Sequence, residues 1–258
     1  MGKLIVRGRR SVSLLMLVGL CQWLGPPVLD AQSSGQPGAW LRSRPRLLLN
    51  DLIRLPAEAV SRPGRPLLGI GLLVTATGSL FLDESVREAV RPDGSLSPTL
   101  RDWIVHPFML DRVQLAVGLH AGPAVLLGAG WLTGAEGLTR WGGALLETVL
   151  LVDMTVLPMK ILTGRQRPRA GPAYAFEPIG SVNDAFPSGH TAWAVGIARI
   201  VEGSEAPRWI KVLAWAGGIG VALQRIGADE HWTSDVVVGG LFGLWVGGRV
   251  AARYWPRR

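Results

Sequence analysis

The chain has 258 residues, of which 48% are hydrophobic and 34 are glycine, and its formal net charge is +8. Its basic residues lie between apolar stretches and not in one patch or arm, so anionic lipid and cytoplasmic loops explain them better than nucleic acid does. The single cysteine, Cys21, excludes a disulfide within the chain and a thiolate metal site. This composition favours packed membrane helices and predicts no nucleic-acid partner.

Residues 1–31 have the pattern of a secretory signal peptide. Basic residues precede the apolar run SVSLLMLVGLCQWLG, and cleavage could follow Ala31. An N-terminal anchor that is not cleaved is the alternative. Residues 32–66 are rich in Ser, Pro and Arg and are interpreted as a polar or amphipathic linker, in which RLLLNDLIRL could lie on the membrane surface.

Apolar segments follow as far as the C-terminus and predict an all-α integral membrane bundle of about six transmembrane helices, with residues 67–258 as one domain. The segments cover residues 67–82, 113–133, 142–162, 191–201, 209–226 and 236–252. Gly239, Gly243 and Gly247 recur on one face of the last segment and predict a seam where another helix packs closely. Tryptophans near the segment ends are interpreted as interfacial anchors. They are Trp141, Trp209, Trp232 and Trp255.

Two histidines stand where a polar loop meets an apolar segment. His190 lies in AFPSGHTAWAV and His231 lies in RIGADEHWTSD. If all the segments cross the membrane, the loop after the third and the loop before the last emerge on the same side. We therefore expect the following polar side chains at one depth: Lys160, Arg167, His190, Arg225, His231 and Asp235.

Such a cluster suits a phosphate group. Two arginines and a lysine that converge need an anion between them, and guanidinium geometry matches phosphate oxygens. In the stretch PSGH, Pro187 and Gly189 would shape a tight turn, and Ser188 is a natural N-cap. The backbone N–H groups of the helix that follows would point toward an oxyanion.

The histidines add the groups that a phosphoryl transfer requires. His231 and Asp235 are four residues apart and share one face of a helix that has begun by then. A carboxylate bonded to one ring nitrogen would fix the tautomer and leave the other nitrogen as a nucleophile, and His190 could protonate the leaving oxygen. This indicates a phosphohistidine mechanism, and the scarcity of acidic residues in ligand-like spacing predicts no catalytic metal.

Neighbouring polar residues are given ordinary roles. Arg165 and Arg169 are interpreted as solvated or lipid-facing charges, and Asp229 and Glu230 as a solvated loop. Asp184 could face a substrate head group. His106 and His120 show no pattern of partners and are interpreted as structural.

Three motifs together resemble the signature of the type 2 phosphatidic acid phosphatase superfamily, which includes membrane lipid phosphatases, bacterial acid phosphatases and vanadium haloperoxidases. Lys160 to Pro168 fits K-x6-R-P, residues 187–190 read PSGH, and Arg225 to Asp235 fits R-x5-H-x3-D. The resemblance implies that His231 is the nucleophile, Asp235 its orienting group and His190 the acid and later the base. It also implies a phosphate site, made of Lys160, Arg167, Ser188, Gly189 and Arg225. At Gln224 the family commonly has Ser, which puts one hydrogen bond to phosphate in doubt.

The function expected from these motifs is metal-independent hydrolysis of a phosphomonoester or pyrophosphate of a membrane lipid, with no cofactor. Phosphatidic acid, phosphatidylglycerophosphate, a polyprenyl pyrophosphate and a lipid A phosphate are all candidates, and the sequence does not choose among them. A vanadium-dependent haloperoxidase-like enzyme and a non-catalytic lipid-binding membrane protein are the alternatives. The sequence does not indicate the oligomeric state.

The orientation in the membrane has two opposed indications. If the signal is cleaved and all segments cross, Lys160 lies in the cytoplasm, whereas the distribution of basic loop residues places it outside. Both agree if residues 67–82, which Thr75, Thr77 and Gly78 interrupt, are not a full span. We predict a protein of the bacterial cell envelope with an extracytoplasmic active site.

Overall fold

The computed structural model describes residues 47, 50, 74–91, 94–105, 112–179, 181 and 183–256. The chain divides into two units, Met1–Leu55 and Pro56–Arg258, and the account below concerns the second. The predicted signal peptide or anchor at 1–31 lies outside the described residues. So does the predicted linker at 32–66, apart from Leu47 and Asn50.

Helices make up the regular structure of the described residues, in agreement with the predicted all-α class. The one strand-like feature among them is an isolated bridge between Arg165 and Phe176. The helices are α4 Asp83–Val90, α5 Pro98–Val105, α6 Arg112–Thr133, α7 Glu136–Thr163, α8 Gly189–Gly203, α9 Arg208–Gly227 and α10 Thr233–Tyr254. The last five contain the apolar segments predicted from residue 113 onward. In the first segment, residues 74–80 are helical and a turn at 81–82 separates them from α4.

Length and apolar composition single out α10 as the described helix that could cross a membrane by itself. The stretch Val117–Thr133 of α6 is apolar but shorter. Helices α7, α8 and α9 carry more polar residues or are too short for this criterion. The bundle is therefore helical as predicted, and the number of crossings stays a prediction.

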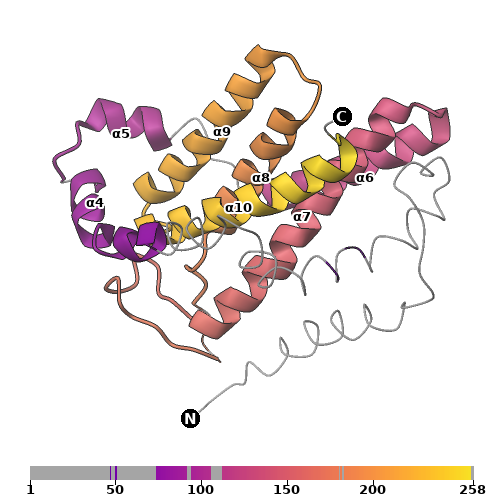
Figure 1. Ribbon diagram of the computed structural model, residues 1–258. Coiled ribbons are helices and arrows are strands. Elements are labelled where there is room, and N and C mark those ends of the chain that lie inside the picture. The colour runs from indigo at the N-terminus through magenta and orange to yellow at the C-terminus, as the bar shows by residue number, and fades with distance from the viewer. Residues whose placement is uncertain are drawn as a thin grey trace, which may run out of the picture. The chain divides into compact units, whose positions relative to one another are not determined.

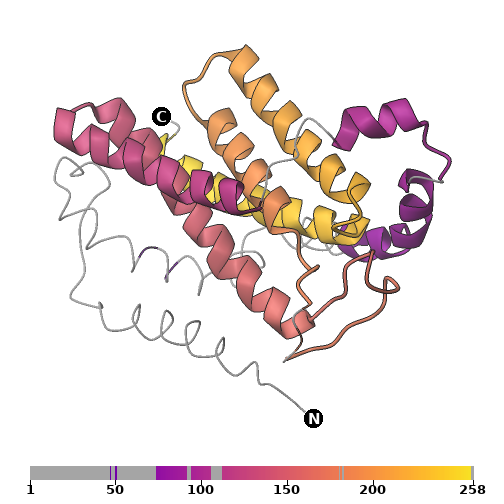
Figure 2. The ribbon, with the colours of Figure 1, turned by 180° about the vertical axis from the view of Figure 1, so that it is seen from behind.

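The core lies where α7, α8 and α10 meet. Helix α8 packs along α10 on one side and α9 on the other, while α6 runs beside α7, as both views of the ribbon show (Figures 1 and 2). Small and β-branched side chains fill the centre; among them Leu151 of α7, Ala192 of α8 and Val246 of α10 are completely buried. Apolar side chains also cover the outside of the bundle, such as Leu132 of α6 and Val212 of α9.

The helix order brings four helix ends to one end of this bundle. Helices α7 and α9 end there, and α8 and α10 begin there. Gly164 ends α7 in the left-handed conformation, with φ of 53°, and its N–H donates to the Lys160 carbonyl. Because a β-carbon at this position would collide with the Glu177 carbonyl, only glycine fits the turn from the apolar helix into the arginine-rich loop.

The glycine stripe of α10 forms the seam that its spacing predicts. A β-carbon at Gly239 would meet the Ser188 carbonyl, one at Gly243 the Ala192 carbonyl, and one at Gly247 the Gly196 carbonyl. The backbones of α8 and α10 thus touch along the stripe. Since Ser188 is part of the PSGH turn, the seam also fixes where that turn lies.

Replacing Gly243 by Ala should destabilise the protein by about 1–3 kcal/mol, because the new methyl group overlaps the α8 backbone. Gly240→Ala is the matched control, since its β-carbon would lie 3.9 Å from the nearest atom, an ordinary contact. Thermal unfolding in detergent measures both. Equal melting temperatures for the two variants would contradict the close seam.

Candidate active site

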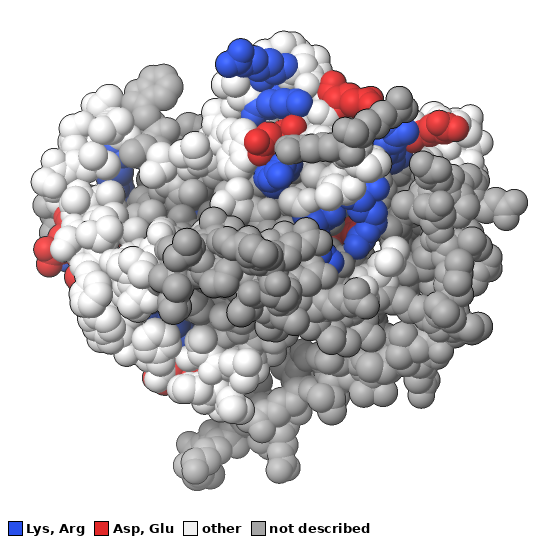
Figure 3. All heavy atoms as spheres, viewed as in Figure 1, with Lys and Arg blue, Asp and Glu red and all other residues white. Residues whose placement is uncertain are grey.

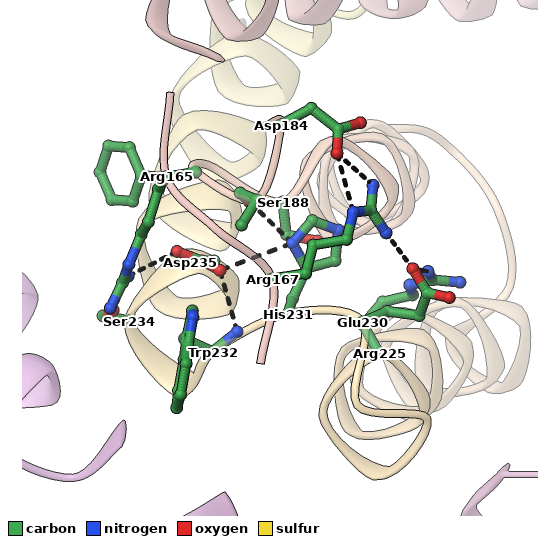
Figure 4. Close-up of polar contacts among 12 residues, drawn as sticks. Arg165, Arg167, Asp184, Ser188, Arg225, Glu230, His231, Trp232, Ser234 and Asp235 are labelled. Atoms are coloured by element: carbon green, nitrogen blue, oxygen red, sulfur yellow. Dashed lines mark hydrogen bonds and ion pairs between the residues drawn. The ribbon is translucent and has the colours of Figure 1, made fainter. Parts of the chain in front are cut away.

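His231 lies at the centre of the group of polar residues that the three motifs bring together (Figure 4). Its ring is buried, and Nδ1 lies 2.7 Å from the backbone carbonyl oxygen of Ala185. A carbonyl only accepts hydrogen bonds, so Nδ1 carries the proton and donates it. The lone pair is then on Nε2, the nitrogen that a nucleophile requires.

The neutral form of His231 is strongly favoured. Burial and, to a smaller extent, the charges of Lys160 and Arg167 together lower the pKa of its ring to about 4, against the opposing effect of the Asp235 carboxylate. The imidazole therefore keeps its lone pair at neutral pH.

Asp235 lies beside the ring but does not hold it in the way the sequence predicts. Its Oδ2 is 3.6 Å from His231 Nδ1, too far for a hydrogen bond, and accepts one of 2.9 Å from the Trp232 backbone N–H. The predicted bond to the ring is made instead by the Ala185 carbonyl. Asp235 therefore acts on His231 through charge, and it caps the first turn of α10.

Arg165 holds Asp235 from the other side. The interpretation of Arg165 as a solvated or lipid-facing charge is wrong, because its side chain is 0% exposed. Its guanidinium donates to Asp235 Oδ1 at 2.6 Å, to Ser234 Oγ at 2.6 Å and to Asp83 Oδ2 at 2.7 Å. Two carboxylates and one guanidinium thus form a buried network that joins α4, the loop after α7, and α10.

The backbone of Arg165 supports the other partner of His231. Its carbonyl accepts a hydrogen bond of 3.1 Å from the N–H of Ala185, whose own carbonyl accepts from the His231 ring. Trp232 packs under the Arg165 guanidinium, 5.6 Å from ring centroid to Cζ, and is buried, so its interpretation as an interfacial anchor is wrong. One residue therefore fixes both neighbours of the histidine.

The basic side chains lie on the opposite side of His231 and are paired with acidic groups (Figure 4). Arg167 donates to Asp184 Oδ1 at 2.7 Å and forms an ion pair with Glu230, while Lys160 donates to the Asp184 backbone carbonyl. Arg225 lies 3.3 Å from the same Glu230 oxygen. Figure 3 shows basic and acidic side chains gathered toward the top of that view, where Figure 1 has the connection from α8 to α9 and the C-terminus, so these charges lie at the other end of the bundle from His231.

The ion pairs of Arg167 shift the pKa values of the groups that form them. Burial would raise the pKa of Asp184, but the hydrogen bond from Arg167 and the charge of Lys160 outweigh it and lower this pKa to about 2. Burial acts against the charge of Arg167, yet Asp184 and Glu230 raise its pKa above the usual value. The interpretation of Glu230 as part of a solvated loop is wrong: its side chain is 14% exposed and also pairs with Arg169.

The PSGH turn lies where its motif predicts, with a different set of hydrogen bonds. Ser188 is the N-cap of α8, but its hydroxyl bonds the Thr191 hydroxyl at 3.0 Å and does not cap the helix. Its backbone N–H donates to the Asp235 carbonyl at 2.9 Å, which ties the second motif to the third. Gly189 and His190 form the first turn of α8, at the same end of the bundle as Lys160.

Gln224 accepts a long hydrogen bond of 3.4 Å from the neighbouring Arg225, so its amide oxygen contacts a residue of the predicted phosphate site. Within the ranges that the structure describes, no three His, Cys, Asp or Glu side chains form a group able to hold a metal ion. Asp229, also interpreted as solvated loop, pairs with Arg87 of α4 at 3.0 Å. His106 lies outside the described residues.

Removing Arg165 should destabilise the protein far more than removing a surface arginine. Arg165→Ala leaves two buried carboxylates without their partner, at a cost of about 3–5 kcal/mol. Arg169→Ala, which removes an arginine that is 52% exposed and also paired with a carboxylate, should cost under about 1 kcal/mol. Denaturant unfolding in detergent measures the difference, and similar losses would contradict the buried network.

The low pKa of His231 predicts a loss of stability in mild acid. The unfolded chain binds a proton at this histidine near pH 6.5, whereas the folded one does so only near pH 4. Protonation therefore favours the unfolded state as the pH falls between these values, by about 2 kcal/mol from pH 7.5 to pH 5. His231→Asn keeps a donor to Ala185 but does not titrate, so its melting temperature should fall less over this interval. An equal fall in both proteins would contradict the buried neutral histidine.

Comparison with known proteins agrees with this geometry. Residues 141–258 match the PAP2 superfamily. The chain is 36% identical over 73 residues to a lipid A 1-phosphatase of Porphyromonas gingivalis, covering 27% of this chain and 16% of that protein. It is 31% identical over 75 residues to an undecaprenyl-diphosphatase of Sulfolobus acidocaldarius, covering 29% of this chain and 35% of that protein. No solved structure matches it. All three motifs lie within residues 141–258, the part of the chain that matches the PAP2 superfamily.

Proposed function

We propose that this protein is a lipid phosphatase of the membrane, which hydrolyses a phosphomonoester or diphosphate without a metal and through a phosphohistidine at His231. The observation that carries the proposal is the His231 ring, buried and neutral, with Nδ1 bonded to Ala185 and arginines on its other side. Both relatives described above are named as phosphatases of lipids. The matched segments are short, so the activity of the whole chain is inferred from the site.

The arginine cluster supports an oxyanion as the ligand. Arg167 and Arg225 both contact the Glu230 carboxylate, which shows that their guanidinium groups converge on one acidic group. A phosphate has the same oxygen chemistry and more charge. It would bind between Lys160, Arg167 and Arg225 as Glu230 and Asp184 give up part of their contacts. Ser188 and Gly189, at the start of α8, would complete the phosphate site.

The reaction then has two steps. Nε2 of His231 attacks phosphorus, the bond from phosphorus to the leaving oxygen breaks, and His190 donates a proton to that oxygen. Water next attacks the phosphorus of the phosphohistidine, His190 takes the proton of the water, and the bond from Nε2 to phosphorus breaks. The Nδ1 proton stays on the ring throughout, where Ala185 accepts its hydrogen bond and the Asp235 charge stabilises the cationic phosphohistidine.

The bundle supports a substrate that is itself in the bilayer. Helix α10 can span a membrane, and exposed apolar side chains such as Leu132, Leu157 and Val212 cover its neighbours. We infer that α6 to α10 lie in the membrane, with the active site at the end where Lys160 and His231 lie. We infer also that this end faces the outside of a bacterial cytoplasmic membrane.

Phosphate release by the full chain in detergent tests the proposal. With EDTA present, wild-type protein should release phosphate from one or more members of a lipid phosphate panel, and His231→Asn should lower kcat at least 1000-fold. Arg167→Gln should raise KM or abolish turnover, whereas Arg140→Gln, which changes an exposed arginine of α7, should not.

Thermal unfolding confirms that each variant is folded. Full activity of His231→Asn, or loss of wild-type activity in EDTA with recovery on adding a divalent metal, would contradict the metal-free phosphohistidine route. Absence of release from every lipid by folded wild-type protein would contradict the proposed function itself.

A further inference from the structure

A second polar cluster lies beside the candidate active site, on helices that otherwise present apolar residues. His120 of α6 and Asp153 of α7 form a pair of 2.7 Å between Nε2 and Oδ2, and Trp193 of α8 donates from Nε1 to Asp153 Oδ1 at 3.0 Å. The proposed chemistry uses none of these three residues, here called the His120 cluster. Three helices each contribute one member.

The cluster is open to the surroundings of the bundle. The side chains of His120 and Asp153 are 39% and 34% exposed, and residues one helical turn away, Val117 and Leu157, are apolar and more than half exposed. An ionisable pair on such a surface is costly in a membrane and indicates a function. A carboxylate can accept about four hydrogen bonds, so Asp153 can accept from a ligand beyond its two protein donors.

Its position relates it to the leaving group of the reaction. The Trp193 ring contacts two histidines, with centroids 5.9 Å from His120 and 5.6 Å from His190. His190 is the proposed donor to the leaving oxygen, so the alcohol attached to that oxygen lies on the His190 side of the phosphate. Asp153 precedes Lys160 by two helical turns, about 10 Å along α7. The His120 cluster therefore lies beside His190, on the side of the phosphate where the alcohol of the lipid would be.

We infer that the His120 cluster is a subsite for a hydroxyl-rich lipid alcohol, and that the substrate is a phosphorylated glycolipid and not a polyprenyl phosphate. This inference rests on the proposed function. A sugar ring offers hydroxyl donors to Asp153, a hydroxyl that can donate to or accept from the other ring nitrogen of His120, and an apolar face for Trp193. A polyprenyl chain would place hydrocarbon against the polar pair and would offer it no further hydrogen bond.

The test compares two phosphomonoesters in the same detergent: an acylated hexosamine 1-phosphate and a polyprenyl monophosphate. Wild-type protein should show a kcat/KM at least tenfold higher for the glycolipid. Asp153→Asn and His120→Gln should each reduce the ratio of the two kcat/KM values about tenfold, mainly through the KM of the glycolipid. Thr155→Val is the matched control on α7, since its hydroxyl bonds only its own helix backbone, and it should keep the wild-type ratio.

A purely structural tie between α6, α7 and α8 gives another result, in which Asp153→Asn lowers kcat/KM for both substrates alike. That outcome, or a wild-type preference for the polyprenyl ester, would overturn the inference.

A binding measurement tests the subsite separately from the proposed function. The glycolipid without its phosphate should change the tryptophan fluorescence of wild-type protein, and this change should be absent in Trp193→Phe and weakened in Asp153→Asn. Binding without any phosphate release would contradict the proposed function and support the subsite, whereas release without binding would do the reverse.

Discussion

The ion pair between Arg165 and Asp235 is the interaction on which the rest of the site depends. It is completely buried, and Asp83 of α4 shares the same guanidinium. A buried arginine needs such partners, since each unpaired hydrogen would cost free energy. By holding Asp235 with its side chain and Ala185 with its backbone, Arg165 sets both groups that face the His231 ring. The proposed nucleophile is therefore oriented before any substrate enters, which is what preorganised catalysis requires.

On the other side of His231, opposite charges hold the basic residues ready. Asp184 and Glu230 neutralise part of the charge of Arg167 and Arg225, so these basic side chains can lie close together without a ligand. In the proposed function the same pairs would make binding selective, because only a strongly charged oxyanion would compete with two carboxylates. The site thus combines a rigid, dry side that fixes the histidine with a charged side that can exchange partners.

The sequence predicts the part of this arrangement that depends on local pattern. Apolar periodicity finds α6 to α10, and the spacing of glycine in α10 finds the seam, because both follow from contacts within one helix or one face. The sequence does not predict contacts that depend on packing between distant parts of the chain. Nothing near Arg165 shows that Asp83, far earlier in the chain, will accept from it in the interior. The His120 and Asp153 pair is missed for the same reason, since its members lie on different helices. The local signal that Arg165 could be buried is its place directly after Gly164, the residue that ends an apolar helix.

The stereochemical course at phosphorus tests the central claim most directly. A phosphorothioate monoester made chiral at phosphorus with two oxygen isotopes would be hydrolysed by the wild-type protein in water that carries the third isotope, and the configuration of the released thiophosphate determined. Transfer to His231 followed by transfer to water inverts the configuration twice, so the account predicts overall retention. Overall inversion would show that water attacks the substrate directly and would contradict the phosphohistidine.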